Sequence, residues 1–183
     1  MFRNVPSSAV LLSILGLIPF YAFGLMIWAI LYSQGDTITM AASRWMGFLL
    51  NAQLIYTALI ASFLGAIHWG LAMANIGWEK QLRPDPERWD DGGQGNPKYE
   101  PAVRQMLYSI MPCLFAWAIV LLFQFLLIGW LAILLMILLL VGIWIGDRNA
   151  VRFNLAPPWF TELRGPMTIF AIGGLVISLL ATT

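Results

Sequence analysis

Long runs of apolar residues, broken by short polar segments, dominate the order of residues along this chain. A transmembrane α-helix needs about 20 consecutive apolar residues to cross ~30 Å of hydrocarbon. Three stretches meet this requirement directly: residues 9–32, 46–75 and 166–182. Each of them therefore predicts one membrane-spanning helix.

A fourth stretch, between Arg104 and Asp147, contains no charged residue and is too long for one crossing. As a helix it would measure roughly 63 Å at ~1.5 Å per residue. Two crossings joined by a tight turn at Gly129 fit this length. The stretch thus predicts helices at 106–126 and 130–146.

The pattern as a whole predicts an all-α integral membrane protein. We expect a five-transmembrane-helix bundle that forms a single membrane domain over residues 1–183, with 76–105 as its one substantial loop. Composition supports this class, because the chain is 60% hydrophobic and only 10% charged, whereas a soluble domain carries about 25% charged residues. The net charge of +1 offers no basic face for nucleic acid. The single cysteine, Cys113, excludes an internal disulfide and a Cys-x-x-Cys motif.

The basic residues predict the orientation of the bundle. Nine of the ten lie in the segments that five crossings place on one side of the membrane: Arg3, Lys80, Arg83, Arg88, Lys98, Arg104, Arg148, Arg152 and Arg164. Only Arg44 falls on the other side. By the positive-inside rule the first side is cytoplasmic, so the N-terminus and loop 76–105 are expected there and the C-terminus in the periplasm. The first apolar segment is too long for a cleaved signal peptide, and we expect a multi-pass protein of the bacterial inner membrane.

Tryptophans form two groups that match this arrangement. Three are expected at the outer interface, Trp28, Trp45 and Trp130, and three at the inner one, Trp78, Trp144 and Trp159. Residues 147–165, with Trp159, are expected in the headgroup plane, with their three arginines facing lipid phosphates.

His68 is the only histidine, and it lies inside the second predicted crossing. An ionisable side chain at such a position is costly and marks a candidate functional site. We expect a polar cluster of His68 with Tyr108, Ser109, Asp147 and Arg148, all near the cytoplasmic ends of their helices. The candidate binding residues are His68, Trp69, Tyr108 and Asp147.

Three roles remain open for His68. It can be a structural hydrogen-bonding group between helices, a contact for a ligand such as a tetrapyrrole, or a proton relay with Asp147. No catalytic residue is predicted, because hydrolase, zinc-peptidase and phosphate-binding motifs are lacking. No metal site is predicted either, since the loop carboxylates do not match a calcium-binding spacing.

Small residues follow one face of the second crossing: Ala58, Ser62, Gly65 and Ala72. Such a face allows two helices to approach closely in lipid. The interpretation is helix packing.

Several motifs resemble those of a known family. They are Gly16-Leu17-Ile18-Pro19-Phe20, Ser62 to Gly70 with its His-Trp-Gly end, Tyr108-Ser109-Ile110-Met111-Pro112, and Asp147-Arg148. Together they resemble domain-of-unknown-function family 3429, which includes the mitochondrial transmembrane protein 69. The resemblance implies a five-span inner-membrane protein and no established activity.

From these features we expect a non-enzymatic accessory or assembly subunit of a larger inner-membrane complex, respiratory or photosynthetic. Its expected partners are membrane lipids and that complex, with no nucleic acid. The alternative is a binding or carrier protein for a lipid, quinone or tetrapyrrole with His68 in its pocket; no cofactor is otherwise predicted.

Overall fold

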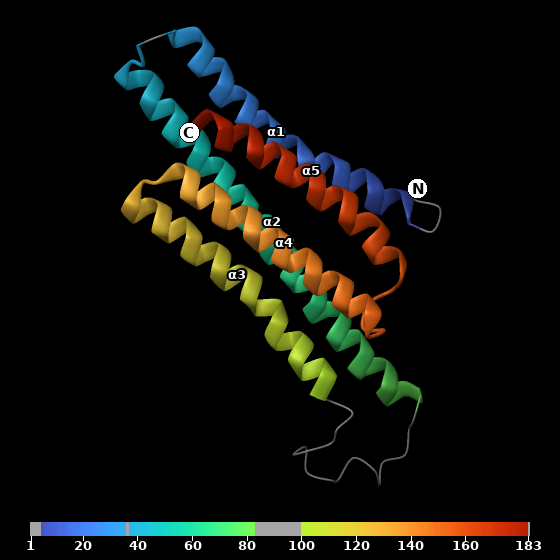
Figure 1. Ribbon diagram of the computed structural model, residues 1–183. Coiled ribbons are helices and arrows are strands. Elements are labelled where there is room, and N and C mark those ends of the chain that lie inside the picture. The colour runs from blue at the N-terminus through green and yellow to red at the C-terminus, as the bar shows by residue number, and fades with distance from the viewer. Residues whose placement is uncertain (1–4, 36, 83–99, 183) are drawn as a thin grey trace.

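The computed structural model describes residues 5–35, 37–82 and 100–182. Within them the chain forms five helices (Figure 1): α1 (Ser7–Gln34), α2 (Met40–Leu82), α3 (Glu100–Leu126), α4 (Gly129–Arg152) and α5 (Trp159–Thr182). No strand occurs in this described part. All five helices are long and apolar enough to cross a membrane, which confirms the predicted all-α, five-helix architecture.

The helices are longer than the apolar runs that predict them. α2 continues to Leu82 and α3 begins at Glu100, so both ends of the expected loop 76–105 are helical; residues 83–99 lie outside the described part of the chain. The reason is physical: hydropathy marks where apolar side chains end, whereas backbone hydrogen bonds continue into water. The expected turn at Gly129 falls at Leu127 and Ile128 instead, and Gly129 is the first residue of α4.

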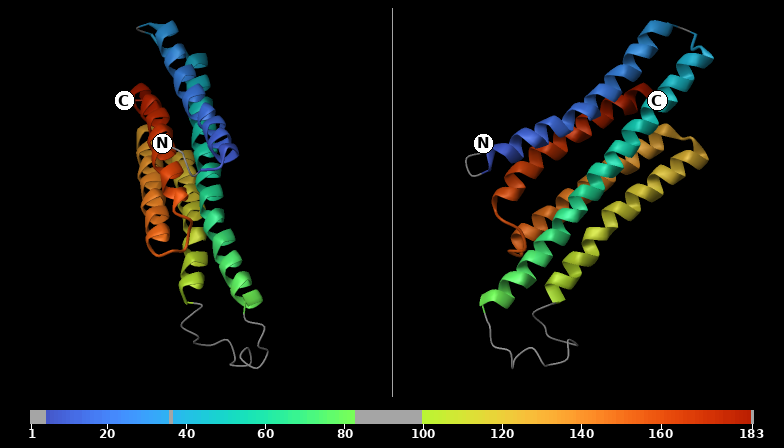
Figure 2. Two further views of the ribbon diagram at one scale, coloured as in Figure 1. Left: turned by 90° about the vertical axis from the view of Figure 1, so that its right-hand side faces the viewer. Right: turned by 180° about the vertical axis from the view of Figure 1, so that it is seen from behind.

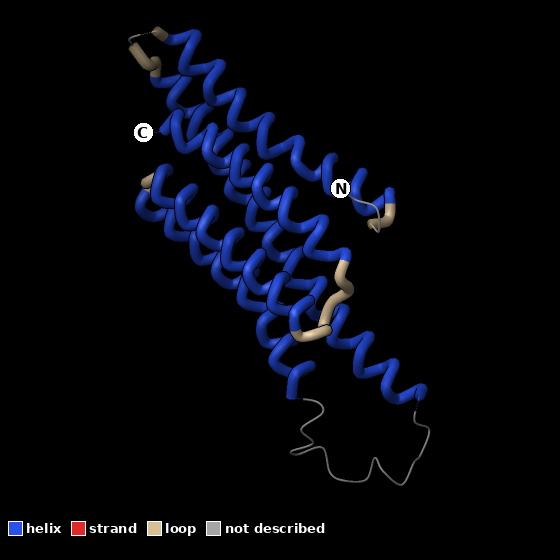
Figure 3. Tube along the Cα trace, turned by 45° about the vertical axis from the view of Figure 1, so that its right-hand side comes forward, coloured by secondary structure: helices blue, strands red, loops and turns tan. Residues whose placement is uncertain are grey.

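α2 is the central helix of the bundle. It packs against α1, α3 and α4, while α5 packs against α1 and α4. Seen from behind (Figure 2, right), α2 runs diagonally across the bundle, with α1 and α5 on one side of it, α3 on the other, and α4 crossing behind it. The connections between helices are short wherever they are described (Figure 3).

The predicted close approach of α2 to a neighbour occurs at Gly65. A Cβ atom at this position would overlap the carbonyl oxygen of Ser109 on α3, so only glycine fits. Ala72, of the same small-residue face, is fully buried. Small residues therefore let α2 and α3 pack backbone to backbone, as expected for helices in lipid.

The first and last helices are parallel and joined by regularly spaced hydrogen bonds. The Tyr21 hydroxyl donates to the Phe170 carbonyl at 2.9 Å, and Trp28 Nε1 donates to the Ile177 carbonyl at 2.8 Å. Both donors and both acceptors are one heptad apart, so the same contact repeats after two turns. Gly174 of α5 permits the approach, since a Cβ there would lie 2.7 Å from the Cβ of Phe20.

Gln53 of α2 ties these two helices to the central one. Its side chain is fully buried, and its Nε2 donates to the Phe20 carbonyl at 2.9 Å and to the Gly174 carbonyl at 3.4 Å. Within the described part of the chain, the amide oxygen of Gln53 has no hydrogen-bond partner. This contact, which we call the Gln53 junction, joins α1, α2 and α5 through neutral groups only.

Candidate functional site

A buried polar network joins α2, α3, α4 and α5 near the end of the bundle that carries the α4–α5 connection. His68 Nε2 lies 2.8 Å from Asp147 Oδ1, and Arg164 Nε lies 2.8 Å from Asp147 Oδ2. Exposed fractions are 1% for His68, 0% for Asp147 and 12% for Arg164. Asp147 thus uses each carboxylate oxygen for a different partner, and its negative charge is balanced by Arg164. His68, Gln105, Asp147 and Arg164 are hereafter the His68 network.

Gln105 of α3 contacts the other side of the imidazole. Its Nε2 lies 3.4 Å from His68 Nδ1 and 3.5 Å from the carbonyl oxygen of Leu155. A carboxylate only accepts hydrogen bonds, so His68 carries a proton on Nε2. An amide nitrogen only donates, so Nδ1 accepts and carries none. With the amide of Gln105 in this orientation, the contacts fit a neutral imidazole that carries its proton on Nε2, and the network is then neutral in total.

Two aromatic rings pack edge-on against the imidazole. The ring centroid of Tyr108 lies 5.1 Å from that of His68, and the Phe160 centroid lies 6.3 Å away. The Tyr108 hydroxyl donates to the Ile143 carbonyl at 3.4 Å. Gly146 leaves room for this hydroxyl, because a Cβ there would overlap it. The rings shield the imidazole from solvent and lipid.

The end of α4 positions the Leu155 carbonyl. Asn154 adopts a left-handed conformation, with φ of 58°. The Asn154 N–H donates to Val151 at 3.0 Å, and the Leu155 N–H donates to Ala150 at 2.8 Å. This pair of bonds is the Schellman motif that commonly ends a helix, and asparagine tolerates its left-handed residue. The local sequence therefore turns the chain sharply after α4 and brings Leu155 to Gln105.

The network lies one hydrocarbon thickness from the opposite ends of α4 and α5. Along α4, Asp147 is about 27 Å from Gly129, and along α5, Arg164 is about 27 Å from Thr182, at ~1.5 Å per residue. The hydrocarbon core is ~30 Å thick. Asp147 and Arg164 therefore mark one boundary of the apolar layer rather than its centre, which lowers the cost of keeping charges there.

Of the predicted cluster, the structure brings His68, Tyr108 and Asp147 together. Trp69 is 45% exposed and faces the outside of the bundle. Ser109 is turned to its own helix, with its hydroxyl donating to the Met106 carbonyl at 2.6 Å. Arg148 is exposed and lies over the ring of Trp144, 5.0 Å from the ring centroid.

Two members of the network were missed by sequence reasoning. Arg164 was expected to face lipid phosphates, and instead it binds Asp147. Gln105 was not singled out at all. It stands three residues before Tyr108, so both side chains project from the same face of α3. That spacing is the signal which could have found it.

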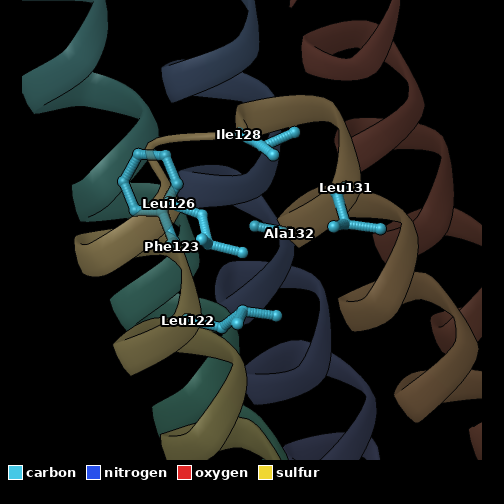
Figure 4. A pocket seen from close by; sticks show the side chains of 6 residues that line it. All are labelled: Leu122, Phe123, Leu126, Ile128, Leu131 and Ala132. Atoms are coloured by element: carbon cyan, nitrogen blue, oxygen red, sulfur yellow. The ribbon is translucent and has the colours of Figure 1, made fainter.

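The arrangement leaves His68 closed to ligands. Both ring nitrogens contact protein groups, so neither is available as an axial ligand without rearrangement. Within the described residues, no three His, Cys, Asp or Glu side chains gather as a metal site. A shallow surface depression lies far from His68, at the α3–α4 turn (Figure 4). Its lining is wholly apolar: Leu122, Phe123, Leu126, Ile128, Leu131 and Ala132.

Five long apolar helices around a buried, charge-balanced network define a multi-pass membrane protein. The chain matches the family described as "Protein of unknown function (DUF3429)" over residues 5–180, and it belongs to that family. No curated protein and no solved structure matches it significantly.

Proposed function

We propose that this protein is a non-enzymatic accessory or assembly subunit of a larger inner-membrane complex, respiratory or photosynthetic. The observation that carries the proposal is the closure of the His68 network. Its imidazole is 1% exposed, and its two nitrogens bind Asp147 and Gln105. A site built in this way braces four helices, and the outer surface of the bundle is then the part available to a partner.

An uncovered stretch of α2 supports contact with a partner helix. Ala66, Gly70 and Ala74 recur every four residues, and all three are exposed. A Cβ atom at Gly70 would meet nothing within 4 Å. Small residues at this spacing allow another membrane helix to approach closely.

The test is gentle detergent extraction from the native membrane followed by native mass spectrometry. We expect the protein in fixed stoichiometry with a larger complex. Gly70→Leu should reduce that recovery at least several-fold while leaving the stability of the isolated protein unchanged. The matched control is Gly142→Leu on α4, which is also exposed and has open space beside it. Recovery of the unmodified protein only as a free monomer would refute the proposal.

A binding or carrier function for a lipid, quinone or tetrapyrrole at His68 receives less support, because a ligand would have to displace Asp147 or Gln105 from the imidazole. Its signature would be a non-protein species in the purified protein that His68→Ala removes.

For the location we propose the bacterial inner membrane, with the N-terminus and the His68 network toward the cytoplasm and the C-terminus in the periplasm. The support is the nine-to-one distribution of basic residues and the positive-inside rule. A reporter enzyme that is active only in the periplasm, fused after Thr182, should be active. A fluorescent protein that matures only in the cytoplasm should be dark there.

A further inference from the structure

The amide of Gln105 is held weakly, although it is buried. Both of its contacts are long, at 3.4 Å to His68 Nδ1 and 3.5 Å to the Leu155 carbonyl. Good N–H···O hydrogen bonds are about 2.9 Å long. The amide oxygen, on the other side, has no hydrogen-bond partner among the residues that the structure describes. A buried acceptor without a partner is rare and requires an explanation.

We propose that Gln105 and His68 form a proton-binding site in which the amide turns over when the imidazole takes up a second proton. In the neutral state the amide N–H groups donate to Nδ1 and to Leu155. In the protonated state Nδ1 carries the new proton. The Nδ1–H group then donates a hydrogen bond to Oε1 of the turned amide. The proton comes from a hydronium ion of the surrounding water: one O–H bond of that ion breaks, one Nδ1–H bond forms, and a water molecule is left.

The surroundings of His68 make both states accessible. Asp147 from α4 contacts the imidazole at 2.8 Å and stabilises an added positive charge, whereas Arg164 from α5 opposes it through the same carboxylate. Tyr108 from α3 and Phe160 from α5 pack with their rings perpendicular to the imidazole. In the neutral state a turned amide would set its oxygen against two acceptors, Nδ1 and the Leu155 carbonyl, so the amide keeps its N–H groups toward them until Nδ1 gains a proton.

Proton uptake has a consequence outside the network. The turned amide presents an oxygen, and no longer an N–H, to the Leu155 carbonyl. Two acceptors that face each other repel, so the connection between α4 and α5 loses this hydrogen bond to α3. The site thereby converts protonation of one imidazole into release of the α4–α5 connection. This inference does not depend on the proposed partner complex.

Because His68 is the only histidine, labelling all histidine with nitrogen-15 reports this one ring by NMR. At neutral pH we expect the proton on Nε2 and none on Nδ1. On acidification Nδ1 should gain a proton, and the carbonyl-carbon resonance of Leu155 should move with the same midpoint. A proton on Nδ1 at neutral pH would overturn the proposal. So would a ring that does not titrate while the protein stays folded, or a Leu155 resonance that ignores the titration.

The variant Gln105→Met keeps the length of the side chain and removes both hydrogen-bonding functions. Loss of the amide should therefore uncouple the Leu155 resonance from proton uptake at Nδ1. Gln124→Met is the matched control, because Gln124 also lies on α3 and donates instead to Asn51 at 2.6 Å. It should leave this coupling unchanged. A Leu155 resonance that still follows the protonation of Nδ1 in Gln105→Met would overturn the role of Gln105.

Discussion

The His68 network and the Gln53 junction solve the same problem with different groups. Both hold helices together through buried polar side chains. The network uses a carboxylate between an imidazole and a guanidinium, whereas the junction uses one neutral amide and two backbone carbonyls. Charges lie where the apolar layer ends, and the neutral amide lies among helices α1, α2 and α5. The difference indicates that removal of one side chain from the His68 network disturbs the remaining members more than removal of Gln53 disturbs its partners.

The largest effect is expected from Asp147→Asn. The change leaves Arg164 partly buried without a counter-charge, and breaking a buried ion pair on one side costs about 3–5 kcal/mol. Unfolding in mixed detergent micelles measures the loss. Arg148→Gln is the control, because Arg148 is exposed and touches only an aromatic ring among its described contacts; its loss should stay below about 1 kcal/mol.

The double variant Asp147→Asn with Arg164→Met tests the same pair further. Removing both charges should restore part of the stability, because no unpaired charge remains. Additive losses would show that the two side chains act independently and would contradict the network.

A smaller loss is expected from Gly174→Ala at the Gln53 junction. The added methyl group would lie 2.7 Å from the Cβ of Phe20, so α1 and α5 must separate slightly. Overpacking of this kind costs about 1–3 kcal/mol. Gly142→Ala, with open space beside it, should be neutral or slightly stabilising in the same unfolding measurement.

Gln53→Leu should cost less than Asp147→Asn, at about 1–2 kcal/mol. It removes donors from two carbonyls, but these remain bonded within their own helices and no charge is exposed. If the loss equalled that of Asp147→Asn, the distinction between the charged and the neutral contact would fail.

The smallest effect is expected outside both regions, at the α3–α4 turn. Leu127 is 73% exposed and has a φ of 54°, a conformation that favours glycine. Leu127→Gly should therefore raise stability by up to about 1 kcal/mol. A decrease would mean that the Leu127 side chain contributes more than its strained backbone costs.

Much of this fold follows from the sequence, because length and hydropathy are properties of single segments. The run without charges before Asp147 predicted two crossings, and α3 and α4 are those two helices. The small-residue face predicted close packing, which Gly65 provides. Hydropathy did not predict the ends of the helices, because backbone hydrogen bonds continue beyond the apolar residues.

The candidate site was predicted only in part. His68 was singled out because an ionisable side chain is costly inside a membrane. Asp147 was singled out because it lies near a helix end on the same predicted side of the membrane as His68. The choice between Arg148 and Arg164 depends on which face of α4 and α5 turns inward. That is decided by the packing of five helices together, and no single segment encodes it. Gln105 carries no charge, so cost in the membrane did not single it out; only its spacing of three residues from Tyr108 could have indicated its place in the network.

The parallel contact between α1 and α5 has a consequence for biogenesis. Tyr21 and Trp28 find their acceptors 149 residues later in the chain. During synthesis the first helix enters the membrane long before the last one exists. Its two donors, and the second bond of Gln53, must wait until α5 has been inserted. The bundle can therefore close only after translation has reached its final helix, and a chain that stops before α5 leaves α1 held by α2 alone.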